Sequence, residues 1–257
     1  MSNPRFLYTD LTTYNFVADE DPSGDFPVSN LATYDIHEYW KAHDASSTQY
    51  LYMDFGVASP RNFVVVDGAN FGTLLVSGII LLQAADDMSF LSGLVDITDF
   101  EGAQNDIPYV HYYAQVSKRF YRFTFTDSLI EQPRIGNIFI DNYLEFTTPY
   151  DYPFVNNDAQ YETVEGVALS GRTRACQIYS TRPTWELKFS LQDDTFRSNY
   201  QTFQSTVMGT CRPFYFVDVD DSANYVHLDT DYSPLISYRK GKNNLEKVVL
   251  RSKDTIE

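Results

Sequence analysis

The chain has 257 residues, which is enough for one large all-β domain or for two domains of ordinary size. Hydrophobic residues make up 43% of it and aromatic residues 16%, and this composition excludes wholesale disorder. The formal net charge of −16 has the wrong sign for a phosphate-binding surface, so we expect no nucleic-acid partner.

Export signals, membrane spans and cysteine motifs are not apparent. The first residues lack the basic start and apolar stretch of a secretory signal. The most apolar segment, Leu74 to Leu82, is far shorter than the roughly 20 residues that span a bilayer. Cys176 and Cys211 form no Cys-x-x-Cys pair and have no His at ligand spacing. We therefore expect a soluble protein without membrane insertion, with two buried free thiols.

Aromatic and β-branched runs alternate with turn signals along the first half, as is typical of a β-sandwich or barrel. We predict short helical segments at residues 35–42 and near Asn70. In the strand at residues 120–126, Tyr121, Phe123 and Phe125 share one face with the preceding Arg119, and we expect one aromatic face of this strand to enter the core. The strands predicted in this half are residues 50–55, 62–67, 78–84, 111–115, 120–126, 137–140 and 144–146.

A segment rich in Pro, Asn and Asp predicts a linker at residues 148–158. It separates a first domain, residues 1–147, from a β-rich second domain, residues 159–257. The predicted fold class is therefore mainly β. The strands predicted beyond the linker are residues 162–170, 174–181, 184–191, 213–219, 225–229, 235–239 and 246–251.

The second domain contains one convincing helix, at about residues 193–208. Asp193 or Asp194 is its expected cap, and Gly209 closes it. Its apolar stripe is expected to pack in the core and consists of Phe196, Tyr200, Phe203 and Val207.

Motifs of the common enzyme classes are not found. His37-Glu38 and His43 are spaced wrongly for a helical zinc motif. The sequence has no Gly-x-Ser-x-Gly elbow, phosphate loop or Gly-x-Gly-x-x-Gly turn. We therefore predict no catalytic residues, no cofactor and no enzyme activity. A glycan hydrolase ranks last among the alternatives, because no motif supports it. Its carboxylate pair is defined by spatial separation, and the sequence singles out no such pair.

Two acidic loops offer oxygen ligands for calcium. The loop at residues 218–224 lacks the Gly and Glu of an EF-hand, so a solvated hairpin loop is favoured there. Asp86 and Asp87 are the other metal candidates, and a turn built on their side chains is the alternative. Tyr39 and Trp40 are candidates for stacking on a sugar ring, with a core position as the alternative for Trp40.

Charge is distributed unevenly along the chain. Residues 1–110 contain three cationic side chains and sixteen carboxylates, whereas residues 239–253 are basic. Two solvated faces are one interpretation, and front-to-tail contacts between copies in a ring are the other. The candidate subunit-contact residues are Arg239, Lys240, Lys242, Lys247, Arg251 and Lys253.

Several segments of the first half resemble the discoidin-like galactose-binding jelly roll over residues 28–147. In that family an extended strand ends in Asp-hydrophobic-Gly, as in Asp54-Phe55-Gly56, and Trp40 stands where an aromatic residue often precedes that strand. The resemblance implies a β-sandwich jelly roll that binds sugars, lipids or proteins through its loops. The segments that carry it are Tyr50 to Gly56, Asn62 to Val66, Ile79 to Gln83 with Asp86 and Asp87, Lys118 to Thr124, and Ile135 to Ile138.

Residues 160–252 are similar to the C-terminal region of bacteriophage tail and baseplate proteins. This similarity implies a ring-forming domain related to distal-tail and tail-tube components, although distal-tail proteins usually place the ring domain first. The segments that carry it are Arg182 to Phe189, Tyr200 to Phe203, Gly209 to Phe216 and Leu245 to Arg251.

The leading functional hypothesis is a structural component of a phage tail or baseplate. It would assemble as a ring of copies and present its jelly roll to other tail, baseplate or fibre proteins. The alternative is a virion carbohydrate-binding module that engages glycans on the host surface. In both cases the protein is made in the host cytoplasm and resides in the virion.

Overall fold

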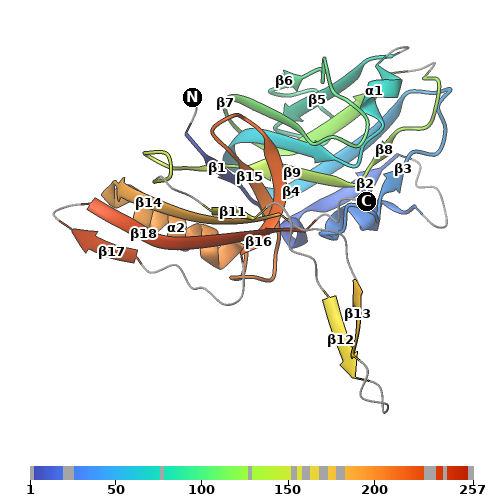
Figure 1. The fold of residues 1–257 in the computed structure, drawn as a ribbon. Helices are drawn as coiled ribbons and strands as arrows, with labels where there is room; N and C mark the ends of the chain where they lie inside the picture. Colours follow the sequence, from blue (N-terminus) through green and yellow to red (C-terminus); the bar gives the residue numbers. More distant parts are fainter. Residues whose placement is uncertain are drawn as a thin grey trace. The chain divides into compact units, whose positions relative to one another are not determined.

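The computed structural model describes residues 3–19, 26–75, 78–126, 129–151, 155–157, 163–167, 173–177, 183–228, 236–239 and 242–253. The chain divides into two compact units (Figure 1). Residues 9–143 form the first, called here the jelly-roll unit. Residues 1–8 and 144–257 form the second, called here the C-terminal unit. Both are mainly β, so the predicted fold class is confirmed.

The jelly-roll unit is a β-sandwich built on two long strands, β4 (Gln49–Asp67) and β7 (Tyr109–Phe125). The strand order is β2-β4-β7-β5-β6, with β9 also paired to β4. The first half of β4 pairs with β2 and its second half with β9. The flanking strands are β2 (Asn15–Ala18), β5 (Ile80–Ala85), β6 (Val95–Thr98) and β9 (Asn137–Asp141).

Four of the predicted strands are halves of these two long strands. The register between β4 and β7 shifts between Asp54 and Ser59, and Gly56 there has a φ of +71°. A glycine in the sequence suggests that a strand ends. Here it lies in a bulge, which bends the strand without ending its pairing. The prediction that one aromatic face enters the core is confirmed, because Tyr121, Phe123 and Phe125 are all fully buried.

The predicted helical segment at residues 35–42 is instead a turn followed by the short strand β3 (Trp40–Lys41). Asp35 accepts hydrogen bonds from the backbone N–H groups of His37 and Glu38, which closes the turn. β3 pairs with β8 (Arg134–Ile135). The helical turn expected near Asn70 is present as α1 (Phe71–Leu74). Two 3₁₀ turns, Leu11–Thr13 and Val28–Ala32, complete the described elements of the unit.

Strand β1 (Arg5–Leu7) belongs to the C-terminal unit, whereas the sequence placed residues 1–147 in the first domain. β1 pairs with β10 (Leu144–Glu145) on one side and with β15 (Phe214–Val217) on the other. An ion pair of 3.0 Å between the side chains of Arg5 and Glu145 also links β1 to β10. The difference arises because strand pairing over more than 200 residues leaves no local signal in the sequence.

The sheet of the C-terminal unit has the order β10-β1-β15-β16-β18-β14-β11, and β17 pairs with β18. Part of the predicted linker is therefore sheet, because β11 pairs with β14 and the Tyr150 side chain is buried. A separate hairpin joins β12 (Thr163–Val167) and β13 (Thr173–Gln177). The remaining strands are β11 (Val155–Asn157), β14 (Thr184–Gln192), β16 (Ala223–Leu228), β17 (Ile236–Arg239) and β18 (Lys242–Ser252).

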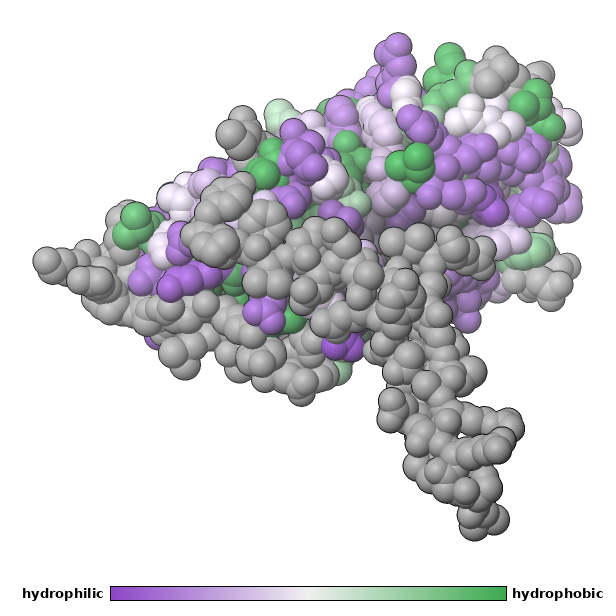
Figure 2. Space-filling model, in the orientation of Figure 1, coloured by the Kyte–Doolittle hydropathy of each residue, from purple (hydrophilic) through white to green (hydrophobic). Residues whose placement is uncertain are grey.

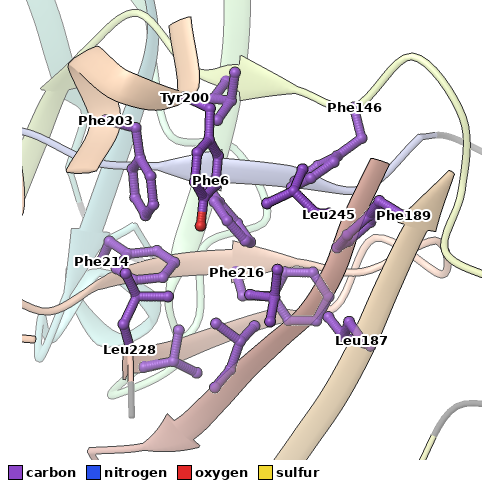
Figure 3. Close-up of a cluster of buried hydrophobic side chains, with 14 of the residues drawn as sticks. Phe6, Phe146, Leu187, Phe189, Tyr200, Phe203, Phe214, Phe216, Leu228 and Leu245 are labelled. Atoms are coloured by element: carbon purple, nitrogen blue, oxygen red, sulfur yellow. The ribbon is translucent and has the colours of Figure 1, made fainter. Parts of the chain in front are cut away.

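Helix α2 (Asp194–Thr206) begins as predicted, with the Asp193 carboxylate accepting the N–H of Phe196. Its Tyr200 and Phe203 lie among Phe6, Phe214 and Phe216 of the sheet (Figure 3). The Phe6 and Phe203 rings are 4.9 Å apart. The stripe of the helix therefore packs in the core, as expected.

Two further expectations concern the surface. Cys211 is exposed, so the expected burial of this thiol is wrong, and the Cys176 side chain lies outside the described set. No helix of the described ranges is long and apolar enough to cross a membrane. On the visible face of the jelly-roll unit, hydrophobic residues stand singly among hydrophilic ones (Figure 2).

Candidate functional site

The jelly-roll unit has an open pocket of about 720 Å³ beside β3 and β8. Its walls come from four separate parts of the chain, which the pairing of β3 with β8 and the loops around α1 bring together. Its volume falls within the range of small-molecule sites, about 300–1,000 Å³. The lining residues are Tyr39, Lys41, Asp44, Ala45, Asn70, Thr73, Asn105, Glu131, Gln132 and Arg134.

Two asparagine side chains fix the loops of this pocket. Asn70, which is 7% exposed, donates through Nδ2 to the carbonyl of Gln132 and accepts through Oδ1 from the N–H of Arg134, both at 2.9 Å. Asn105 accepts from the N–H of Thr73 at 3.0 Å and donates to its hydroxyl. The walls are therefore positioned before any ligand binds.

Tyr39 contributes the aromatic ring of the pocket, and groups of the protein cover both of its faces. Phe26 stacks on it with ring centroids 4.8 Å apart and an interplanar angle of 14°. The guanidinium of Arg134 is 5.2 Å from the Tyr39 centroid and, since Phe26 occupies one face, lies over the other. A ligand would therefore meet the edge of Tyr39.

The charged groups of the pocket differ in their availability. Arg134 donates to Asp106 at 2.6 Å. The Asp44 carboxylate accepts bonds from Ser46 and Ser47, and the Ser47 N–H is the main cause of a lowered pKa for Asp44. Lys41 and Glu131 make no side-chain hydrogen bond or ion pair with the residues that the structure describes. The Lys41 ammonium lies 5.9 Å from the centroid of the Phe26 ring, and both charges can still bind a ligand because neither has an ionic partner among the described residues.

The structure separates the two aromatic residues that the sequence singled out. Tyr39 lines the pocket, whereas Trp40 is 1% exposed and packs against Phe125. Successive side chains of a strand point to opposite faces, so Trp40 on β3 turns into the core. Trp40 therefore occupies the core position that the sequence left as its alternative.

The other lining residues were not predicted. Asn70, Asn105 and Gln132 lie in separate loops, and no local motif distinguishes them from ordinary turn residues. The weak signal present in the sequence is the position of Asn70 three residues after the end of a strand at Asp67 and directly before a helical turn.

The carboxylates of Asp86 and Asp87 make contacts within and beside a turn. Asp86 pairs with Lys118 at 2.7 Å, and Asp87 accepts bonds from the N–H groups of Ser89 and Ser92. Within the described ranges, no three His, Cys, Asp or Glu side chains gather as metal ligands. The carboxylate of Asp220, in the other candidate loop, similarly accepts bonds from Ser222.

The structure describes the side chains of only two of the six candidate subunit-contact residues. Lys240 and the side chains of Arg239, Lys242 and Lys247 lie outside the described set. Arg251 is on β18 and half-buried, and the exposed Lys253 has its ammonium 5.8 Å from the centroid of the Tyr225 ring.

Comparison with known proteins finds similar folds. No protein-family model matches the sequence, and no curated protein matches it. Chitosan-binding module 1 from a chitosanase/glucanase of Paenibacillus sp. IK-5 is 11% identical, with a TM-score of 0.43, and the match covers 52% of this chain and 98% of the module. The family 32 carbohydrate-binding module of Clostridium perfringens NanJ, solved with galactose, is 13% identical, with a TM-score of 0.43 and coverage of 55% and 98%.

A third similar structure is the family 32 module of AlyQ, solved with 4,5-unsaturated mannuronic acid. It is 16% identical, with a TM-score of 0.39, and the match covers 52% of this chain and 96% of the module. The likeness is one of fold over about half of the chain.

Proposed function

We propose that the jelly-roll unit binds a carbohydrate in the pocket beside Tyr39. The observation that supports this most is the wall chemistry, in which the Lys41 ammonium and the Glu131 carboxylate, both without an ion-pair partner among the described residues, line one opening whose loops are held by amide side chains. Sugar hydroxyls both donate and accept hydrogen bonds, so they are matched by walls that offer both kinds of group. An apolar ligand would leave the Lys41 ammonium and the Glu131 carboxylate without partners, at a cost in binding free energy.

The free charges would be the main contacts. The Lys41 ammonium donates to a hydroxyl oxygen, and the Glu131 carboxylate accepts from a hydroxyl. Such charge-assisted bonds are about twice as strong as neutral ones. Because both faces of Tyr39 are covered, the sugar would be held by its hydroxyl groups instead of by stacking on an aromatic ring.

A glycan array and calorimetric titration of the full chain test this proposal. Chitosan oligomers and galactose are the first probes, since they are the ligands named for the similar structures. Glu131→Gln and Lys41→Met should each weaken binding of the best glycan about tenfold or more. Glu101→Gln is the matched control, because Glu101 is also exposed but does not line the pocket. A silent array, or equal effects of the Glu131 and Glu101 variants, would contradict the proposal.

Assembly into a phage tail or baseplate ring remains the prediction made from the sequence. Its test is the mass of the purified full-length protein in solution. A ring-sized oligomer that dissociates at high salt would support front-to-tail contacts between acidic and basic patches. A monomer that binds sugar would leave carbohydrate binding as the favoured role.

A further inference from the structure

Arg122, on the outer face of β7, presents an unused pair of hydrogen-bond donors. Its Nε donates to Oε1 of Gln83 at 2.8 Å. The two terminal nitrogens make no hydrogen bond or ion pair with any described residue. An arginine with a free terminal fork matches the geometry of a carboxylate, which it binds through two parallel hydrogen bonds.

The guanidinium is held in place before any ligand arrives. It lies 4.3 Å from the centroid of Phe90 and 5.0 Å from that of Tyr50. Its partner Gln83 is 7% exposed and donates in turn to Asp96 at 2.7 Å. Ordering a long side chain normally costs binding free energy, and here the fold has already fixed it.

An apolar notch lies next to this arginine. Tyr52, which is directly opposite Arg122 in the β4–β7 register, lines a small cavity of about 30 Å³ together with Val17, Met88 and Phe90. This volume suits a methyl group. The Met88 side chain is 50% exposed, and that of Leu91, in the same loop, is 88% exposed.

The loop that carries these apolar residues has a defined conformation. The Asp87 carboxylate accepts the N–H of Ser92 at 2.8 Å, and the N–H of Asp86 donates to the carbonyl of Ser92 at 3.1 Å. Exposed apolar side chains on a loop of defined backbone, beside a cation without an ion-pair partner among the described residues, are the composition of a protein-docking surface.

We propose that this surface, formed by Tyr52, Met88, Phe90, Leu91 and Arg122, docks a protein segment that carries an Asp or Glu next to a small aliphatic residue. The carboxylate binds the fork of Arg122, and the aliphatic side chain enters the notch. This site is separate from the carbohydrate pocket, because the two share no lining residue.

Charge and ring geometry favour a protein segment over other anions. Tyr50 stacks on Tyr52, with ring centroids 5.9 Å apart, and also contacts the guanidinium of Arg122, so these rings are already engaged within the protein. The exposed carboxylates of Asp96, Asp99 and Glu101 on and after β6 would repel the dense negative charge of an acidic membrane surface.

Selection from a displayed random-peptide library with the full chain tests the proposal. The wild type should enrich peptides with Asp or Glu beside Ala, Val or Leu. The best sequence, made as a blocked synthetic peptide, should bind Arg122→Gln about 10- to 100-fold more weakly. Arg197→Gln is the matched control, because Arg197 is an exposed arginine on α2, outside the jelly-roll unit that carries the docking surface. Its affinity for the peptide should stay within twofold of the wild type.

NMR titration of the wild type with the same peptide gives a readout that needs no variant. The signals of Tyr52, Phe90 and Arg122 should shift, while those of Asn70 and Asn105 should not. Selection without enrichment of acidic residues, or equal binding by Arg122→Gln, would overturn the proposal. The proposal would also be overturned if oligogalacturonate or phosphatidylserine vesicles bound at Arg122 more tightly than any of the selected peptides.

Discussion

Asn70 holds the backbone of Arg134 in place, with its Oδ1 accepting the Arg134 N–H at 2.9 Å. Its Nδ2 bonds the carbonyl of Gln132 two residues earlier, so one buried side chain satisfies two groups of the pocket wall. Buried backbone groups need such partners, because an unpaired one costs free energy.

We expect Asn70→Ala to lower the free energy of unfolding by about 2–3 kcal/mol, because it leaves both backbone groups without these bonds. It should also weaken glycan binding, since the 131–134 wall loses its support. Urea unfolding and calorimetric titration measure the two effects. Asn105→Ala is the control. Asn105 is exposed, so its loss should cost about 1 kcal/mol or less. Asn105 also lines the pocket, so the comparison concerns stability, and equal losses of unfolding free energy for the two variants would contradict this prediction.

The core position of Trp40 leads to a second prediction, for stability. Trp40→Ala should cost about 3–5 kcal/mol, the usual range for removing a buried aromatic side chain. Trp40→Phe should cost clearly less, because the buried Nε1 has no hydrogen-bond partner to lose among the described residues. Chemical unfolding monitored by circular dichroism distinguishes the two variants. If Trp40→Ala left the stability unchanged but abolished glycan binding, the prediction would be wrong and Trp40 would be a ligand contact.

The sequence predicted those features that depend on local periodicity. The alternation Tyr121, Phe123, Phe125 and the stripe of α2 are visible in it because each element buries one face. The pocket was not predictable, because Tyr39, Asn70 and Arg134 meet only through the pairing of β3 with β8. The place of β1 depended in the same way on distant strands. Tyr39 could be proposed from the sequence because an aromatic residue is a candidate sugar contact by its type alone, whatever residues surround it in the fold.

A buried carboxylate predicts how stability changes with pH. Asp141 accepts bonds from the Asn142 N–H and from the Thr9 hydroxyl, and burial raises its pKa above the usual value. The folded state therefore holds this proton more tightly than the unfolded state. Protonated Asp141 therefore stabilises the fold. This stabilisation is fully present below the pKa of about 3.9 that an Asp has in the unfolded chain, and it is lost as the pH rises through the higher pKa of the folded state.

Asp141→Asn should remove this dependence while keeping the contacts, because its amide donates to the Thr9 hydroxyl and its carbonyl accepts from Asn142. The variant should gain stability relative to the wild type as the pH rises above about 4, and the difference should level off once the pH has passed the raised pKa of the folded state. Asp54→Asn should show the opposite trend, because its hydrogen bond with Arg119 lowers the pKa of Asp54. Urea unfolding at pH 3, 5 and 7 measures both variants. A wild type and an Asp141→Asn variant with parallel pH profiles would show that Asp141 keeps its usual pKa in the fold.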